Sequence, residues 1–266
     1  MRFTLLGARG FVGRHLLTYL TSLGHEVIAP ARDARLTEAC HGTHVIYAIG
    51  LTADFRQRPF DTIEAHVSLA AELLRDCDFT SFLYLSSTRV YAGSTNTDEL
   101  AALTVRPGNP SDLYNLSKLS GEAICNASGR PNVRIARLSN VVGPASATSE
   151  SFIGDLCREA AAGHITLRSS MASAKDYIWI DDAVKLLTQI AENGQETIYN
   201  VASGQQTSNA DWVTGLARHT GCRVDVADHA PTITFPPIDI DRIRAEFAFK
   251  PERVIDRIAD ILSFAP

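Results

Sequence analysis

The stretch Gly7-Ala-Arg-Gly10-Phe-Val-Gly13 decides how the N-terminal part of this chain folds. It follows a short apolar run at residues 3–6, which reads as a β-strand, and it opens a segment over residues 11–23 whose apolar side chains recur at helical spacing. Glycine lets the backbone turn tightly and come close to a ligand, and the first turn of a helix offers free N–H groups to an anion. The motif therefore predicts a strand–turn–helix unit that binds a dinucleotide's pyrophosphate through Gly7, Gly10, Phe11, Val12 and Gly13. The alternative is an ordinary strand-to-helix turn that uses glycine for packing.

The end of the second predicted strand, residues 27–29, bears on which dinucleotide is bound. An acidic residue there would accept hydrogen bonds from the adenosine ribose hydroxyls, but this chain has Ala31 followed by Arg32. A guanidinium is permanently charged and forks onto phosphate oxygens, so Arg32, with Arg9 from the glycine loop as a second contact, favours a 2′-phosphate. Alternatively, Arg32 is a solvated loop residue. We expect NADP rather than NAD, with Ala31 and Ala48 included in the cofactor site.

A second group of residues joins Tyr114-Asn-Leu-Ser-Lys118 to the run Ser86-Ser-Thr88. Residues 113–128 read as a helix, so Tyr114 and Lys118 lie one turn apart on the same face. A nearby ammonium favours the phenolate and lowers the pKa of a tyrosine from about 10, which suits proton transfer while a hydride moves. Lys118 can also hold the nicotinamide ribose.

A predicted strand over residues 82–85 leads directly into the polar run Ser86-Ser87-Thr88, which places Ser87 at the carboxyl end of that strand. Strand C-termini are where open parallel sheets bind ligands, and a hydroxyl there can steady a reacting oxygen as charge develops. We therefore predict Ser87, Tyr114 and Lys118 as catalytic residues. Glu122 lies four residues after Lys118, which offers a purely structural alternative for the lysine, an ion pair along the helix.

Composition narrows the class of protein. The chain has 266 residues, 45% of them apolar, and a net charge of −5, so it can bury a large core and lacks the basic stripe of a nucleic-acid binder. The sequence has no run of about 20 apolar residues, so we expect no membrane span. Five scattered cysteines favour reduced thiols and a cytoplasmic location over a disulfide framework. Cys40, His41 and His44 lead into a strand, where neighbours point to opposite faces, so we expect no metal site there.

Strand-like and helix-like segments alternate along the chain, which is typical of a parallel sheet covered by helices. Besides the first strand, helix periodicity marks residues 61–74, 113–128, 181–192 and 209–220, and strand-like runs lie at 44–49, 133–138 and 197–201. Only about a dozen residues separate the second strand from the one at His44, too few for a full crossover. We predict an α/β, Rossmann-like doubly wound sheet whose edge strand is missing or vestigial.

These elements, in this order and spacing, resemble the extended short-chain dehydrogenase/reductases, and more narrowly the NAD-dependent epimerase/dehydratase group that works on nucleotide sugars. The resemblance covers nearly the whole chain. It rests on Gly7 to Gly13, Ser86-Ser-Thr-Arg-Val-Tyr91, Tyr114-x-x-x-Lys118-Leu-Ser-Gly-Glu122, Arg137-Leu-Ser-Asn140-Val-Val-Gly-Pro144, Lys175-Asp-Tyr-Ile-Trp-Ile-Asp-Asp182, Tyr199-Asn-Val-Ala-Ser-Gly204 and Phe249-Lys-Pro251.

The resemblance implies roles for particular residues. Ser87 matches the catalytic Ser/Thr, with Thr88 as a neighbour that could substitute for it on the substrate side, and Tyr114 and Lys118 match the catalytic pair. Asn140 matches an asparagine that helps to hold the substrate, and Lys175 takes the place of one of two arginines that grip the substrate's diphosphate.

The resemblance also implies a domain division and an assembly. Residues 1–150, with 176–204 returning to them, would form the dinucleotide domain, and 151–175 and 205–266 a small substrate lobe. A homodimer through the helix before the Ser87 strand and the helix of Tyr114 is implied as well.

Departures from the family pattern narrow the expected chemistry. Thr88-Arg89 stands where sugar 4,6-dehydratases carry Asp-Glu, and Arg89 stands where the reductase that makes GDP-fucose uses a cysteine. We therefore expect ketone reduction or 4-epimerisation of a sugar-like, nucleotide-linked substrate. The alternative is a non-catalytic NADP-binding sensor or partner-binding protein, since a fold does not determine function.

Overall fold

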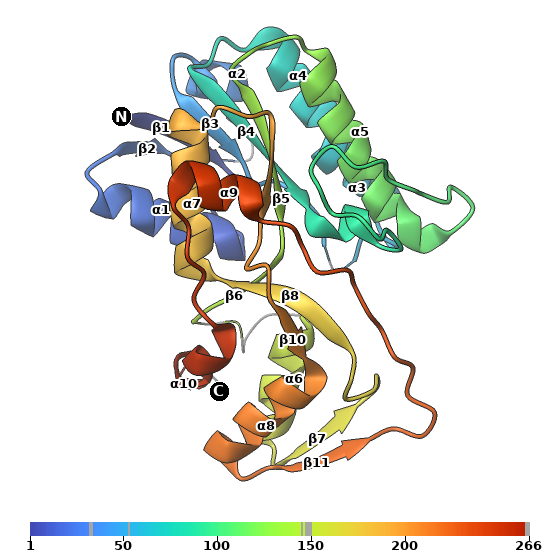
Figure 1. Cartoon of the computed structure of the whole chain (residues 1–266). Coiled ribbons are helices and arrows are strands. Elements are labelled where there is room, and N and C mark those ends of the chain that lie inside the picture. The colour runs from blue at the N-terminus through green and yellow to red at the C-terminus, as the bar shows by residue number, and fades with distance from the viewer. Residues whose placement is uncertain (32–33, 53, 145, 147–150, 264–266) are drawn as a thin grey trace.

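A six-stranded parallel sheet forms the larger part of the molecule (Figure 1). The computed structural model describes residues 1–266 apart from 32–33, 53, 145, 147–150 and 264–266. The strands follow the order β2-β1-β3-β4-β5-β9. Their bounds are β1 (Arg2–Leu6), β2 (Glu26–Ile28), β3 (His44–Tyr47), β4 (Ser81–Ser87), β5 (Val133–Leu138) and β9 (Ile198–Val201).

The predicted fold class is confirmed, including the reduced sheet edge. β2 pairs with β1 alone, and the chain then crosses β1 to enter β3 on its other side. Between β2 and β3 the described residues form only the five-residue helix α2 (Leu36–Cys40). The connection is too short to carry a further strand and its crossover, so the sheet ends at β2.

Helices cover both faces of this sheet. On one face lie α1 (Phe11–Ser22) and α7 (Ile180–Asn193), and on the other α4 (Leu69–Asp76) and α5 (Leu113–Ala127). Successive strand side chains point to opposite faces, so Leu83 and Leu85 of β4 join the first core while Phe82 and Tyr84 join the second. Burial of each such side chain stabilises the fold by about 1.5–3 kcal/mol.

One predicted helix is interrupted. The periodicity over residues 61–74 predicts a single helix, but the structure has α3 (Pro59–Ile63), a π-helical turn at Glu64–Ser68 and then α4. A π-turn inserts one residue into the helical repeat, and such turns are frequent at functional sites. This turn carries His66, which is fully buried.

A smaller part lies below the carboxyl ends of the large sheet (Figure 1). It contains a three-stranded sheet in the order β10-β8-β6 and a parallel pair, β11 with β7. Helices α6 and α8 pack against each other and against that pair. The bounds are β6 (Asn140–Val142), α6 (Phe152–Ala161), β7 (His164–Leu167), β8 (Ala174–Trp179), β10 (Gln206–Ser208), α8 (Asn209–Thr220) and β11 (Arg223–Val226).

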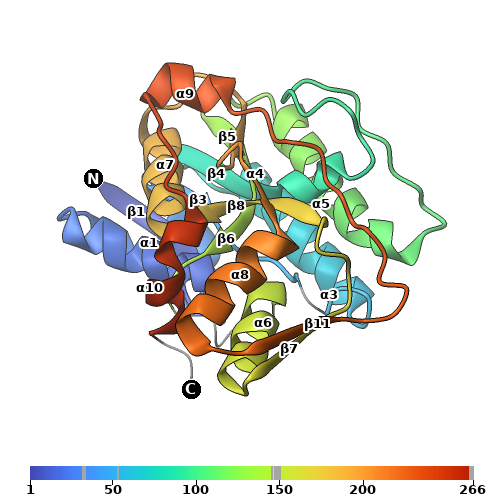
Figure 2. The same ribbon diagram turned by 60° about the horizontal axis from the view of Figure 1, so that its bottom comes forward.

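The last segment of the chain contacts both parts of the molecule (Figure 2). After β11 it reaches α9 (Asp241–Phe247), which packs against β9 of the large sheet, and returns to α10 (Ile258–Leu262), which contacts α8. The domain boundaries given by the sequence stay a prediction. Among the helices that the structure describes, none combines the length and hydropathy needed to span a membrane.

Candidate active site

The glycine loop after β1 packs tightly against the end of β3. Gly7 has a φ of +89°, and a Cβ on it would lie 2.6 Å from the carbonyl oxygen of Ala48. A Cβ on Gly13 would lie 2.1 Å from the oxygen of Gly7, whereas one on Gly10 would meet nothing nearer than 3.4 Å. No other residue type fits at Gly7 and Gly13 without moving the backbone.

The first turn of α1 is left open to a ligand. Gly10 is the N-cap residue and has no side chain to accept from the first N–H groups. Those donors and the positive end of the helix dipole therefore face the loop. The residues present fit a dinucleotide, because the loop gives a pyrophosphate close backbone approach and unpaired donors.

A cavity of about 500 Å³ lies at the carboxyl ends of the large sheet, between that sheet and the smaller part. Many of the residues expected to bind cofactor or substrate, or to catalyse, line it: Gly10, Phe11, Val12, Gly13, Ala48, Ser87, Tyr114, Lys118, Asn140 and Lys175. Residues distant in sequence thus converge where open α/β sheets bind ligands.

Other expected residues lie away from the lining. The hydroxyl-bearing Thr88 is buried at the start of a short 3-10 helix, Thr88–Tyr91, and does not line the cavity. Arg9 and Ala31 are exposed and do not line the cavity. Arg32 lies outside the described residues. The roles predicted for these four residues stay predictions.

Tyr114 and Lys118 both reach the cavity from α5. The Lys118 Nζ donates to the carbonyl oxygen of Leu85 at 2.8 Å, which ties the helix to the end of β4. Burial lowers the pKa of Lys118 to about 7, although Glu122 opposes this effect. Lys118 therefore changes charge near neutral pH.

The electrostatic environment of Tyr114 differs from the expectation. Burial raises the pKa of its phenol, while a hydrogen bond with Ser87 and the charge of Arg89 act in the opposite direction. The cation that favours the phenolate here is thus Arg89, because Lys118 is turned towards Leu85.

Arg89 is a cavity residue that the sequence reasoning did not assign to the site. Its Cζ lies 5.2 Å from the ring centroid of Tyr114 and 5.1 Å from that of Phe55. Its Nη2 donates to the carbonyl oxygen of Ser111 at 3.2 Å. Its position two residues after Ser87 was the available signal, since the first turn after a strand end faces the site.

His66 is a second residue that the sequence reasoning left without a role. Its Nδ1 lies 2.7 Å from the Ser117 Oγ, and its Nε2 accepts from the backbone N–H of Leu51 at 3.1 Å. Burial, with the nearby charge of Lys118, lowers the pKa of His66 to about 3, so the ring is neutral. His66 therefore holds the loop after β3 against the helix that carries Tyr114.

Glu122 does not form the expected alternative ion pair with Lys118. It pairs with the buried Arg137 of β5, whose Nη2 lies 2.7 Å from the Glu122 Oε2. Glu122 also accepts from the Ser86 hydroxyl, and Arg137 donates to the Tyr91 hydroxyl at 2.7 Å. These contacts fix the end of β4, which carries Ser87, relative to α5.

Asn140 and Lys175, for which the sequence predicts substrate contacts, come from the adjacent strands β6 and β8 of the smaller part. The Asn140 Nδ2 donates to the carbonyl oxygen of Asp176 at 2.8 Å. Lys175 lies among Phe152 and Phe235, 5.9 and 5.6 Å from their ring centroids, and burial lowers its pKa.

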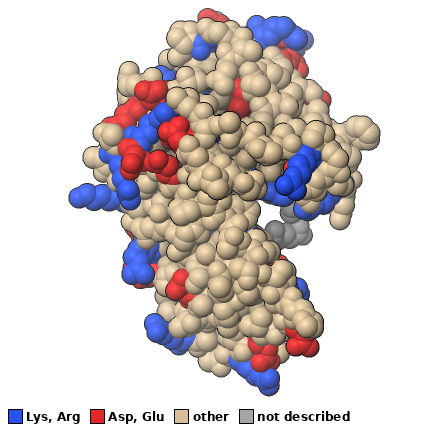
Figure 3. All heavy atoms as spheres, turned by 45° about the vertical axis from the view of Figure 1, so that its right-hand side comes forward, with Lys and Arg blue, Asp and Glu red and all other residues tan. Residues whose placement is uncertain are grey.

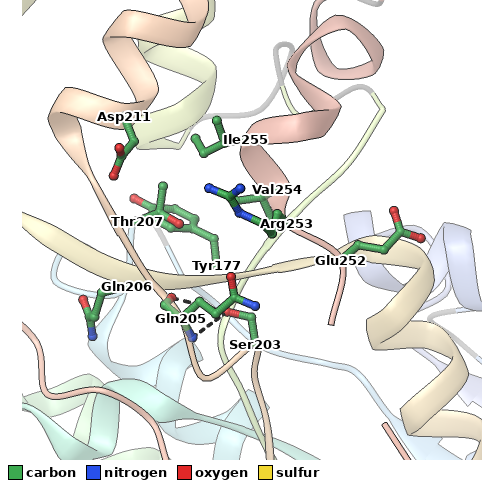
Figure 4. Close-up of a pocket in the computed structure, with 10 residues that line it drawn as sticks. All are labelled: Tyr177, Ser203, Gln205, Gln206, Thr207, Asp211, Glu252, Arg253, Val254 and Ile255. Atoms are coloured by element: carbon green, nitrogen blue, oxygen red, sulfur yellow. Dashed lines mark hydrogen bonds between the residues drawn. The ribbon is translucent and has the colours of Figure 1, made fainter. Parts of the chain in front are cut away.

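A second, smaller cavity lies between β8, β10 and the segment before α10 (Figure 4). Its volume is about 70 Å³, which is room for a few waters only. Tyr177, Ser203 and Arg253 are among its lining residues. Among the described residues no group of three or more His, Cys, Asp or Glu is arranged to hold a metal ion.

Comparison with known proteins agrees with this architecture. The model of the NAD dependent epimerase/dehydratase family matches residues 3–202. GDP-mannose 3,5-epimerase 1 of Oryza sativa subsp. indica is 23% identical in an alignment over 248 residues. The match covers 78% of this chain and 66% of that protein, slightly less than two thirds of its length.

Two solved structures show the same fold. RMD from Pseudomonas aeruginosa, complexed with NADPH, has a TM-score of 0.81 and 23% identity, with 100% of each chain covered. The UDP-glucose 4-epimerase of Thermus thermophilus, complexed with NAD, has a TM-score of 0.80 and 17% identity, with 100% of this chain and 99% of that one covered. Because the family model spans most of the sequence, from the glycine loop to the end of β9, this chain belongs to the NAD-dependent epimerase/dehydratase family.

Proposed function

We propose that this protein is an NAD(P)-dependent oxidoreductase that acts on a sugar-like, nucleotide-linked substrate, either as a ketoreductase or as a 4-epimerase. One observation carries the proposal: a single cavity joins the glycine loop to Ser87, Tyr114 and Lys118. Related folds supply the substrate class, since one solved neighbour was captured with UDP-glucose and NAD.

The bound nicotinamide would exchange a hydride with the substrate carbon, and the residues of this chain would handle the proton. Tyr114 would take the proton from the sugar hydroxyl, or give it to the ketone, while Ser87 holds the same oxygen. Lys118 would hold the nicotinamide ribose. Asn140 and Lys175 would hold the substrate on the side of the smaller part, and Thr88, the neighbour of Ser87, would be a further substrate contact that could substitute for Ser87.

The choice of cofactor rests on the loop arginines. Arg9 is exposed in the glycine loop, and Arg32 follows Ala31 where a carboxylate would otherwise accept the ribose hydroxyls. We therefore propose a preference for NADP. A homodimer through α4 and α5, which light scattering would test, and a cytoplasmic location are likewise proposals.

The first experiment asks which dinucleotide the purified protein holds. Absorbance and mass spectrometry of the denatured protein identify any bound cofactor. Tightly held NAD favours the epimerase, and exchangeable NADPH favours the reductase. Failure to bind either cofactor would contradict the proposed function.

The second experiment replaces Tyr114 by Phe. Turnover of nucleotide-linked sugars or ketosugars should fall by about 10²–10⁴-fold, because the proton donor is lost, while cofactor affinity is kept. Tyr19→Phe makes the same chemical change at a half-buried residue of α1 that does not line the cavity, and it should leave turnover unchanged. If function survives Tyr114→Phe, the protein is a dinucleotide sensor rather than an enzyme.

A further inference from the structure

Among the residues that the structure describes, the lining of the cavity holds three basic side chains and no carboxylate. Lys118, Arg89 and Lys175 all reach it, and there is no Asp or Glu among the lining residues that the structure describes. The protein as a whole carries a net charge of −5, so this concentration of positive charge is local. Figure 3 shows a notch between the larger and smaller parts, with basic side chains gathered at its upper border. Such a site favours ligands with more than one anionic group.

Arg89 forms no ion pair with a described carboxylate, although the charge of Asp112 acts on its guanidinium. Its backbone N–H donates to the Ser87 Oγ at 3.2 Å, and its guanidinium lies against the rings of Phe55 and Tyr114. The guanidinium has five N–H donors, and within the part of the chain that the structure describes only Nη2 has an acceptor, the Ser111 carbonyl oxygen. No carboxylate of the described residues forms an ion pair with it. A partly buried guanidinium with free donors favours an anion that can take two of them at once.

The other two cations have partners under the proposed function. Lys118, which lies close to Gly50 after β3, would hold the ribose, and Lys175 on β8 would meet the substrate's diphosphate from the smaller part. Arg89 lies instead next to Tyr114 and Ser87, where the sugar ring would react. Arg89 and Lys175 both line the cavity, so the two side chains face a common space. Burial, and then the positive charge of Arg89, lower the pKa of Lys175.

We propose that the reacting sugar itself carries a carboxylate, received by Arg89, so that the substrate is a nucleotide-linked uronic acid rather than a neutral hexose. This inference rests on the proposed function and names its substrate class. The planar carboxylate would accept two parallel N–H donors of the guanidinium and would orient the ring beside the Tyr114 hydroxyl. Arg89 thus determines specificity.

Two base-matched pairs of probes test this: UDP-glucuronic acid against UDP-glucose, and GDP-mannuronic acid against GDP-mannose. Each is measured for kcat/KM, and for equilibrium binding by calorimetry with NADP⁺ present. The wild type should prefer the uronate of one pair, and Arg89→Gln should lower that preference by about 10–100-fold. Arg89→Lys keeps the charge and loses the fork, so it should fall between the two.

The ratio within a pair separates specificity from general damage. Loss of the electrostatic support that Arg89 gives Tyr114 would slow both members of a pair equally, whereas loss of the carboxylate contact affects the uronate alone. Arg56→Gln is the matched control, because Arg56 also contacts Phe55 and Ser111 but is exposed and does not line the cavity. It should leave the ratio unchanged.

Three results would overturn the inference while leaving the proposed function intact. The wild type could use the neutral sugars as well as the uronates, Arg89→Gln could lower both members of a pair equally, or Arg56→Gln could change the ratio as much as Arg89→Gln. If no nucleotide sugar binds although the dinucleotide does, the proposed function fails and the inference fails with it. Dinucleotide binding by each variant verifies that the variant is folded. If Arg89→Gln does not fold, the uronate preference of Arg89→Lys decides whether the inference holds.

Discussion

At the scale of single residues, Lys118 shows how the site is maintained at a cost to the fold. It is a basic residue, only 4% exposed, and Glu122, whose charge favours the protonated lysine, is already paired with Arg137. Its folded pKa of about 7 lies below the ordinary value of 10.5. Between these two values the unfolded chain holds a proton that the folded chain has released, so the Lys118 contribution to stability rises with pH across this window.

We therefore expect Lys118→Met to abolish turnover and to stabilise the fold. The gain should be about 1–3 kcal/mol at pH 6.5, where the wild type has to bury the charged form, and should shrink towards pH 10. Urea unfolding at pH 6.5 and 9.5 measures this difference. Lys185→Met, which removes an exposed lysine from α7, should show no such pH-dependent difference. A Lys118→Met gain that is equal at both pH values would contradict the assigned pKa.

At the scale of elements, the loop between β1 and α1 does two separable things. Gly13 is needed for packing, since a Cβ there meets the Gly7 oxygen at 2.1 Å, whereas the space beside Gly10 is open to 3.4 Å. Both glycines line the cavity, but only Gly13 lacks room for a Cβ, so Gly10 and Gly13 form a matched pair for substitution.

Gly13→Ala should destabilise the protein by about 1–3 kcal/mol, because the loop must move to accept the methyl group. Gly10→Ala should leave unfolding by urea almost unchanged and should weaken dinucleotide binding, measured by fluorescence titration. Equal losses of stability in both variants would show that the loop does not divide in this way.

The same scale shows what the sequence can and cannot predict. Glycine spacing and the Tyr114–Lys118 repeat depend on local geometry, so the strand–turn–helix unit and the shared helix face could be predicted. The π-turn at Glu64–Ser68 breaks the helical period by one residue, and no local pattern shows that His66 turns inwards. Spacing along α5 suggested Lys118 as the partner of Glu122. The actual partner is Arg137 of β5, and only the tertiary fold brings these two residues together.

At the scale of the whole molecule, a buried polar network joins distant segments. From Ser86 it runs through Glu122 and Arg137 to Tyr91, whose hydroxyl donates to the Asn200 Oδ1 at 2.9 Å. The Asn200 Nδ2 in turn donates to the carbonyl oxygen of Asp239, before α9. Helix α5, three strands of the sheet and the C-terminal segment are thus fixed relative to one another.

Arg137→Met should therefore lower the free energy of unfolding by about 3–5 kcal/mol, because the Glu122 carboxylate is left buried without a partner. Adding Glu122→Gln to that variant should restore part of the loss, and urea unfolding of the single and double variants measures the coupling. A loss below about 1 kcal/mol for Arg137→Met would mean that the pair behaves like an exposed one.

The short edge strand β2 has a consequence for how long a cofactor stays. β2 is the edge strand of the large sheet and has only three residues, so a dinucleotide seated on the glycine loop would meet little protein beyond that edge. Such an edge shortens residence time, because little protein has to move before the ligand departs. Rapid turnover of the cofactor suits a catalyst that consumes a fresh reductant in each cycle better than one that keeps a captive dinucleotide.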